Sequence, residues 1–237
     1  MQFSKIVAPS VKELFIRRVE SMILTGELAV GDALPSEREL AEQMEISKTA
    51  VHSGIVEMAR KGFLEVVPRR GVFVGDYAKN GTLEALISIM QHNGGRLDAR
   101  NARSMLEVRC AIEEVAITHV TSRRDAKTLR ELQDIADMAQ AVAEGPEPVD
   151  VNRLAELYFT FHHVLCVASG NTIIPLIMNA FRTPAIQLWA KSARSLGIQE
   201  SIARLLRFME LIRAGNVEEA RAYMRWIDQT SLAAVLS

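Results

Sequence analysis

The segment 34–75 constrains the fold of this chain most, because it carries two helix-start signals in quick succession. Ser36 is followed three positions later by Glu39, which forms a capping box at the start of a short helix. Ser47 is a second N-cap, and the helix that it begins runs to about Lys61. Two short helices joined by a tight turn are the helix-turn-helix arrangement of many DNA-binding proteins.

The second of these helices has an apolar face and a polar face. Val51, Ile55 and Met58 follow one another at helical spacing and are expected to face inward. The polar side chains at its exposed N-terminal end are Lys48, Thr49, His52 and Ser53. In a helix-turn-helix that end enters the major groove, so we expect these four side chains to contact DNA.

A two-stranded wing is predicted directly after this helix. Residues 63–67 and 72–74 are β-prone, and the turn Pro68–Gly71 between them is basic. The pattern predicts a hairpin that presents Arg69 and Arg70 at its tip, where they would meet the DNA backbone.

The distribution of charge agrees with this interpretation better than the total does. The net charge of the chain is −1, which is not that of a globally basic nucleic-acid binder. Residues 36–45 hold four Glu and one Arg, a net charge of −3. Residues 47–74 hold five Lys or Arg and two Glu, a net charge of +3. We therefore expect the positive charge to lie on the second helix and the wing, where phosphates are met.

Three parts of this segment resemble the N-terminal domain of the GntR family of bacterial transcription regulators: the run Leu34–Ala41, the turn Ile46–Lys48 and the wing tip Arg70–Gly71. The resemblance implies a winged helix-turn-helix. The DNA-binding residues that it implies are Arg38, Ser47, Lys48, Thr49, His52, Ser53, Arg69, Arg70 and Gly71. The family often has Arg at positions 48 and 52 and Pro at position 50, where this chain has Lys, His and Ala. The operator sequence therefore does not carry over.

The rest of the chain is predicted to be almost entirely helical. We expect a first helix over 11–25. The winged helix-turn-helix domain should cover residues 1–75, followed by a linker over 76–81 and a helical domain over 82–237. The helices of this domain are placed at 82–92, 99–121, 125–143, 151–168, 172–195, 199–213 and 216–235. Pro184 is a candidate break in the helix over 172–195. The fold class is mainly α, with an antiparallel bundle of six to eight helices.

Composition limits the location and the chemistry. Hydrophobic residues make up 49% of the 237 residues and aromatic residues only 5%, so the cores should consist of Leu, Ile, Val, Ala and Met. We find no apolar run of membrane length and no signal peptide, and we expect a cytoplasmic protein without membrane contacts. Cys110 and Cys166 lie far apart and are expected to be small core residues, not a disulfide or a metal pair.

The helical part resembles the FCD ligand-binding domain of the FadR subfamily of GntR regulators. The residues that carry the resemblance are Glu107-x-Arg109-x-x-x-Glu113, Phe161-His162 with Ala168–Asn171, and Ile212–Ala220 with Met224. The resemblance implies a homodimer on a two-fold symmetric double-stranded operator, controlled by a small-molecule effector.

Helical-wheel positions place several polar side chains inside this bundle. Arg109 and Glu113 both face inward, one turn apart. They form either an internal ion pair or an anion site for an effector carboxylate or phosphate, and the two interpretations do not exclude each other. His162 and Tyr158 also point inward; a lone inward His is more often a hydrogen-bonded core residue than a metal ligand.

Many FCD domains hold a divalent metal through one Asp and three His. In this chain Tyr158 stands at the Asp position, and Leu205 and Ile227 stand at two of the His positions, so only His162 remains. One His does not hold zinc, and we expect no metal and no cofactor. The positive charge for an acidic effector would then come from Arg109, with Tyr158 and His162 as orienting donors and Leu205 and Ile227 as apolar walls.

The sequence therefore predicts a transcription regulator, expected to be a repressor, whose operator binding is controlled by a carboxylate or a phosphorylated metabolite. The alternative is a helical-bundle enzyme or ligand-binding protein with a fused DNA-binding module. No nucleophile–base pair, Gly-rich phosphate loop or metal cluster supports an enzyme. A nucleoid protein is a third possibility, which the near-neutral DNA-binding domain and the large apolar bundle disfavour.

Overall fold

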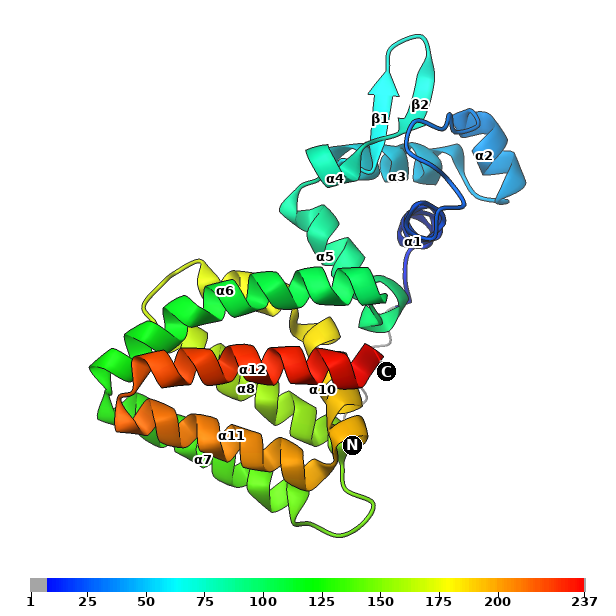
Figure 1. The fold of residues 1–237 in the computed structure, drawn as a ribbon. Coiled ribbons are helices and arrows are strands. Elements are labelled where there is room, and N and C mark those ends of the chain that lie inside the picture. Colours follow the sequence, from blue (N-terminus) through cyan, green and yellow to red (C-terminus); the bar gives the residue numbers. More distant parts are fainter. Residues whose placement is uncertain (1–7, 237) are drawn as a thin grey trace, which may run out of the picture. The chain divides into compact units, whose positions relative to one another are not determined.

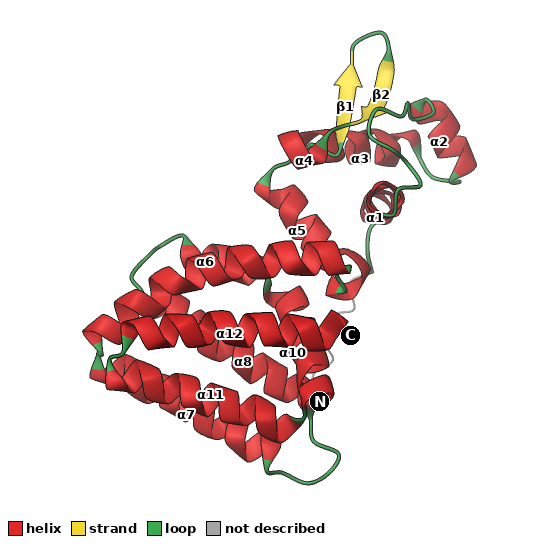
Figure 2. Cartoon of the chain, viewed as in Figure 1, coloured by secondary structure: helices red, strands yellow, loops and turns green. Residues whose placement is uncertain are grey.

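The computed structural model describes residues 8–236 (Figure 1). The chain divides into two compact units, Met1–His92 and Asn93–Ser237. Figure 2 shows that the described part is mainly helical, with one two-stranded sheet. Residues 1–7 of the expected domain 1–75 and residue 237 of the expected domain 82–237 lie outside the described residues.

The N-terminal unit contains the predicted helix-turn-helix. Its helices are α1 (Val11–Leu24), α2 (Glu37–Gln43) and α3 (Lys48–Lys61). Ser36 and Glu39 form the predicted capping box at the start of α2, and the Ser47 side chain accepts a hydrogen bond from the Ala50 N–H at the start of α3. Gly62, at φ +90°, ends α3 in the left-handed conformation that glycine adopts at little cost.

The wing consists of β1 (Leu64–Val67) and β2 (Gly71–Val74), paired antiparallel so that Leu64 lies opposite Val74. The segment before α2 adds to this sheet, because the Gly31 and Leu34 N–H groups donate to carbonyl oxygens of β2. This second, short pairing was not expected from the sequence. It ties the base of the wing to the residues that lead into α2.

The predicted apolar face of α3 forms the core of this unit. Val51, Ile55 and Met58 are buried against α1, where Phe15 and Val19 face them. These two apolar faces pack together and hold α3 in place without using its polar side, which stays exposed.

The structure divides the chain at a different place from the predicted linker over 76–81 and the predicted domain start at residue 82. The segment contains a helical turn, α4 (Tyr77–Asn80), and α5 (Leu83–Gln91) packs on the N-terminal core through Ala85 and Ile89. Lys61 donates to the Ser88 hydroxyl and strengthens this contact. The boundary lies after His92, within the short 3₁₀ helix His92–Gly95, because α5 buries its apolar side against α3.

The C-terminal unit is a helical bundle, and seven α-helices of its described part agree with the predicted range of six to eight. They are α6 (Ala99–Arg123), α7 (Ala126–Ala143), α8 (Val151–Ala168), α9 (Ile174–Ala180), α10 (Arg182–Leu196), α11 (Ile198–Ala214) and α12 (Val217–Leu236). The central helix α8 packs against α6, α7 and α10. None of the described helices is both long and apolar enough to cross a membrane.

The expected helix over 172–195 is two helices, α9 and α10. The chain bends at Phe181, and Pro184 lies in the first turn of α10. A proline there costs no helical hydrogen bond, because the first N–H groups of a helix have no partner within it. The interior of the bundle is aliphatic with a few aromatic rings, and Leu132, Leu154 and Phe161 are completely buried.

We predict that Gly54→Ala loosens the packing of α1 on α3. A Cβ atom at Gly54 would lie 2.3 Å from Cδ1 of the buried Phe15 ring. Overpacking of this kind costs roughly 1–3 kcal/mol, which exceeds the gain of about 1 kcal/mol in helix propensity. Hydrogen-exchange mass spectrometry should show faster exchange in peptides from α1 and α3.

The matched control is Ser53→Ala, at the exposed neighbouring position of α3. It should leave the exchange of α1 unchanged. Equal protection of α1 in Gly54→Ala and the unmodified protein would contradict the proposed importance of this contact.

Candidate functional site

The exposed side of α3 presents the side chains that the sequence predicted for DNA contact. Lys48, Thr49, His52 and Ser53 are all exposed, and they lie on the side of the helix away from its buried face. Val56, one turn after His52, is also exposed at 52% and was not predicted. An exposed aliphatic side chain on this face suits contact with the methyl group of thymine. The sequence signal for Val56 was its spacing of four residues from His52, which places both side chains on the same face of the helix.

His52 is oriented by the preceding helix. Its Nδ1 lies 2.8 Å from Oε1 of Glu37 at the start of α2. When Nδ1 carries the proton, Nε2 of a neutral ring is an acceptor, which suits the amino group of cytosine or adenine. His52 therefore offers a different base contact from the Arg that the family often has at this position.

Arg38 lies on the exposed side of α2. Its Nε donates to Oε1 of Glu42 at 2.9 Å, and both side chains are highly exposed. Exposed pairs of this kind contribute little to stability, so the guanidinium can exchange Glu42 for a phosphate at small cost.

The wing tip turns sharply and presents two arginines. Arg69 has φ +63° and Gly71 has φ +121°, and both arginines are exposed. The Arg70 guanidinium lies 5.7 Å from the centre of the Phe73 ring, which supports it beside β2. This geometry leaves the charged ends available to a DNA backbone.

Not all of the expected positive charge lies on this surface. Lys61 is largely buried and pairs with Glu20 at 3.0 Å, and Arg60 pairs with Glu84 at 2.5 Å. Of the five cations in residues 47–74, these two serve internal contacts of the N-terminal unit. The cations that remain exposed beside the polar side of α3 are Lys48 of that helix, Arg69 and Arg70 of the wing tip, and Arg38 of α2.

A cavity of about 40 Å³, open to solvent on one side, lies between α8, α10, α11 and α12 of the bundle. Four predicted effector residues line it: Tyr158, His162, Leu205 and Ile227. The other two predicted residues, Arg109 and Glu113, do not line it. The residues that complete its wall are Trp189, Ser192, Leu196, Ser201, Arg204, Phe208 and Ser231.

The hydroxyl group of Tyr158 is buried and has no hydrogen-bond partner in the described structure. Burial raises the pKa of this phenol, so it stays protonated and remains a donor. An unpaired buried hydroxyl is costly unless something binds it, such as water or a ligand. Tyr158 therefore supports a polar occupant of the cavity.

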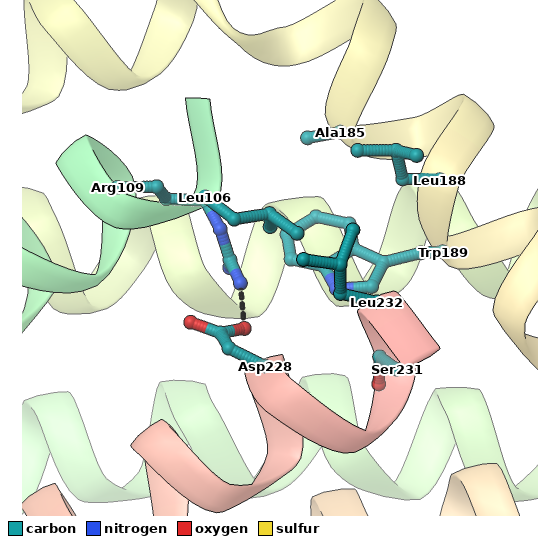
Figure 3. A pocket seen from close by; sticks show the side chains of 8 residues that line it. All are labelled: Leu106, Arg109, Ala185, Leu188, Trp189, Asp228, Ser231 and Leu232. Atoms are coloured by element: carbon teal, nitrogen blue, oxygen red, sulfur yellow. Dashed lines mark hydrogen bonds and ion pairs between the residues drawn. The ribbon is translucent and has the colours of Figure 1, made fainter. Parts of the chain in front are cut away.

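Arg109 is completely buried beside this cavity and is held by two carboxylates. Its guanidinium pairs with Glu113 of the same helix at 3.2 Å and with Asp228 of α12 (Figure 3). It also lies over the Trp189 ring, 4.9 Å from the ring centre. Figure 3 shows Arg109 and Asp228 facing each other across the space between α6 and α12. The structure thus contains the internal ion pair between Arg109 and Glu113. The role of Arg109 in binding an effector stays a prediction.

The cluster around Arg109 holds two carboxyl groups, those of Glu113 and Asp228, and one guanidinium. Burial raises the pKa of Glu113, but the charge of Arg109 and the nearby His162 outweigh it and leave that pKa lowered. Burial also raises the pKa of Asp228, and Arg109 offsets this only in part, so the pKa lies at about 6. One guanidinium between two carboxylates stabilises one of them fully and leaves the second prone to protonation.

His162 connects the cluster with the cavity. Its Nδ1 lies 3.3 Å from Oε1 of Glu113, an ion-pair distance at which the ring does not complete a hydrogen bond. Its ring stacks on Trp189 with centres 5.0 Å apart and at an angle of 20°. A ligand that moves His162 or Trp189 would therefore act on the Arg109 cluster.

Sequence reasoning missed Asp228, Arg204 and Trp189. Asp228 follows Ile227, a position already assigned to the cavity, and an acid on that inward face was an available signal. Nothing in the local sequence distinguishes Arg204 from the other arginines of α11, because its place depends on how α11 packs on α12. Trp189 required the tertiary structure for the same reason.

The residues present do not fit the metal site of related FCD domains. Tyr158, Leu205 and Ile227 lie around His162 in the cavity wall, and none of the three is a ligand that zinc prefers. Within residues 8–236, no group of three or more His, Cys, Asp or Glu side chains is placed to hold a metal ion.

We predict that Asp228→Asn changes how the stability of the bundle depends on pH. The pKa of Asp228 is raised from 3.8 to about 6 in the folded protein, so its protonated form favours folding. That contribution is present below about pH 4 and is lost as the pH rises through 6, and it amounts to at most about 3 kcal/mol. The unfolding free energy of the unmodified protein minus that of the variant should fall over this range.

Urea titrations followed by tryptophan emission measure this difference, because both tryptophans of the chain, Trp189 and Trp226, lie in the bundle. The control is Asp134→Asn, at an exposed position on α7. It should change the unfolding free energy at pH 7 by no more than about 0.5 kcal/mol. A difference for Asp228→Asn that stays constant from pH 4 to 7 would contradict the raised pKa.

Comparison with known proteins identifies both units. The family model described as bacterial regulatory proteins, gntR family, matches residues 13–74, and the FCD domain model matches residues 104–227. The HTH-type transcriptional regulator Mce2R of Mycobacterium tuberculosis is 30% identical over 182 residues, which cover 77% of this chain and 73% of that protein. LutR of Bacillus subtilis is 25% identical over 211 residues, covering 86% and 91%.

A solved structure shares the fold. Lar, which controls the expression of the Listeria monocytogenes agr system, aligns with a TM-score of 0.64 at 13% sequence identity, over 98% of this chain and 99% of that chain. The two family models together cover α3, the wing and the cavity-lining residues up to position 227. The chain therefore belongs to the GntR family of bacterial transcription regulators and carries an FCD domain after its winged helix-turn-helix.

Proposed function

We propose that this regulator is a repressor that binds a two-fold symmetric operator as a homodimer and releases it when a small anionic metabolite enters the bundle cavity. Members of this family are transcription regulators, and no enzymatic activity is proposed. The observation that carries the DNA-binding part is the exposed polar face of α3 beside the basic wing tip. The cavity in the FCD domain supports the effector part.

Arg38, Thr49 and His52 are proposed to read or position the operator, and Lys48, Arg69 and Arg70 to contact phosphates. Ser47 caps α3 and Gly71 shapes the wing tip, so both also act through the backbone geometry. Ser53 and Val56 complete the exposed face of α3. This division follows from exposure and charge, because long cations reach phosphates and the start of a recognition helix reaches base edges.

An anion is the proposed effector because the described cavity wall contains hydroxyl, imidazole and guanidinium groups and no carboxylate. The apolar part of the wall, including Leu205 and Ile227, suits an uncharged remainder of the molecule. An effector changes DNA binding only if its affinity differs between two states of the protein. The stacked Trp189 and His162 are a suitable element, because they contact both the cavity and the Arg109 cluster.

We predict that Lys48→Ala and Arg70→Ala each weaken operator binding and reduce its salt dependence. Each loses about one phosphate contact, so the slope of log affinity against log salt should fall by about 1. Fluorescence anisotropy with a labelled operator over a salt series measures the slope. Arg38→Ala and Thr49→Ala should weaken binding at every salt concentration.

The control for these variants is Arg60→Ala. Arg60 is also an exposed cation of α3, but it lies at the opposite end from Lys48 and pairs with Glu84. Its removal should leave the slope unchanged. If Arg60→Ala flattens the salt dependence and Lys48→Ala does not, the opposite end of α3 faces the DNA.

We predict two chains on each palindromic operator. One recognition helix presents few base-reading side chains, and two such helices would occupy half-sites on one side of the duplex. Sedimentation velocity of the protein with operator DNA should give a complex with two chains. An operator reduced to one half-site should bind much more weakly, and equal binding to the half-site by a single chain would contradict the dimer.

A further inference from the structure

Arg204 carries the one permanent charge among the described residues that line the bundle cavity. It comes from α11, and its side chain is only 12% exposed. Arg109, the cation that the sequence suggested, is already held by Glu113 and Asp228 and lies outside the cavity wall. An anion in the cavity would therefore meet Arg204 before Arg109.

The present contacts of Arg204 leave it able to receive a ligand. Its Nε donates to Oε1 of Glu200 at 2.8 Å, and its Nη1 donates to the Thr230 hydroxyl at 2.7 Å. Nη2 donates to no group in the described part of the chain. Glu200 is about half exposed, so this pair is weak and a ligand carboxylate can replace it. The guanidinium also lies over the Trp226 ring, 4.6 Å from its centre, which holds it at the cavity rim.

We propose that Arg204 is the effector anchor and that the effector is a small monocarboxylate with an uncharged remainder. This inference rests on the proposed function and narrows it. A planar guanidinium binds a carboxylate through two parallel hydrogen bonds. A phosphate monoester carries about −1.5 to −2 charges at pH 7 and needs more than one cation. The other polar groups of the wall, such as Tyr158, Ser192 and Ser201, are neutral hydroxyls that suit one oxygen of the ligand.

The size of the cavity limits the effector further. A volume of 40 Å³ holds about three water molecules, at roughly 10–15 Å³ each in this measure. Short acids are therefore favoured at this site, whose wall includes α11 and α12. Because Arg204 bonds across these two helices through Thr230, carboxylate binding at Arg204 exchanges an interhelical contact for a ligand contact.

Both tryptophans of the chain report on this site, since Trp189 lines the cavity and Trp226 lies under Arg204. The test titrates the full-length protein with sodium salts of straight-chain and 2-hydroxy monocarboxylates of two to six carbons, at constant ionic strength, and follows tryptophan emission. Sodium phosphate, a tetrahedral anion that is partly doubly charged near pH 7, is the anion for comparison. We expect a saturable change with at least one monocarboxylate and none with phosphate at equal concentration.

Arg204→Met keeps the apolar stem over Trp226 and removes the charge. It should weaken carboxylate binding by roughly 10- to 100-fold, as expected for the loss of charge-assisted hydrogen bonds. The carboxylate affinity of Arg204→Lys should lie between those of the unmodified protein and Arg204→Met, because lysine keeps the charge but lacks the planar guanidinium. The matched control, Arg207→Met, removes an exposed arginine of the same helix that pairs with Glu210 and should bind as the unmodified protein does.

Circular dichroism checks that each variant is folded, and Arg204→Gln replaces Arg204→Met if the latter loses helix. Unchanged carboxylate affinity in a folded Arg204 variant would overturn the proposal. Tighter binding of phosphate, or no saturable change with any acid of the series, would overturn it as well. Operator binding is measured separately without any acid, so failure of the DNA-binding function is distinguished from failure of the anchor.

Discussion

The buried guanidinium of Arg109 is the constraint around which the C-terminal bundle is arranged. An unpaired charge in such a place would be very costly, so α6 and α12 must each supply a carboxylate to it. Glu113 and Asp228 do so, and Trp189 of α10 covers the guanidinium. Three helices that are distant in the sequence are thereby held at one point. The cavity lies directly beside this point, on the other side of the aromatic contacts of Trp189 and His162.

This arrangement separates two tasks that the sequence suggested for one residue. Arg109 is charged and inward, and the expected effector anchor was assigned to it. In the structure both of its Nη atoms are held by carboxylates, whereas Arg204 reaches the cavity with a weaker, partly exposed partner. A cation that stabilises a fold needs strong permanent partners, and a cation that binds a ligand needs replaceable ones. The two arginines differ in just this respect.

The DNA-binding unit shows a similar division of its charges. Lys61 and Arg60 belong to the same basic segment as Lys48, but they pair with Glu20 and Glu84 and fasten α3 to α1 and α5. The cations at the opposite end of α3 and at the wing tip remain exposed. The net charge of the segment therefore overstates the charge that DNA would meet. Because α5 is held by these contacts, it belongs to the N-terminal unit.

The sequence by itself determined the helix-turn-helix, its caps and the wing, because these depend on local signals such as Ser36 with Glu39, Ser47 and Gly62. It also determined the inward positions of Arg109, Glu113, Tyr158 and His162, since helical periodicity alone places them. Only the tertiary structure decided which inward groups meet. Asp228, Trp189 and Arg204 take their partners from other helices, and the packing of α10, α11 and α12 sets those contacts through side-chain fit over long sequence separations. The domain boundary after His92 was decided in the same way, because the burial of α5 against α3 is a property of the folded unit and not of the residues near the boundary.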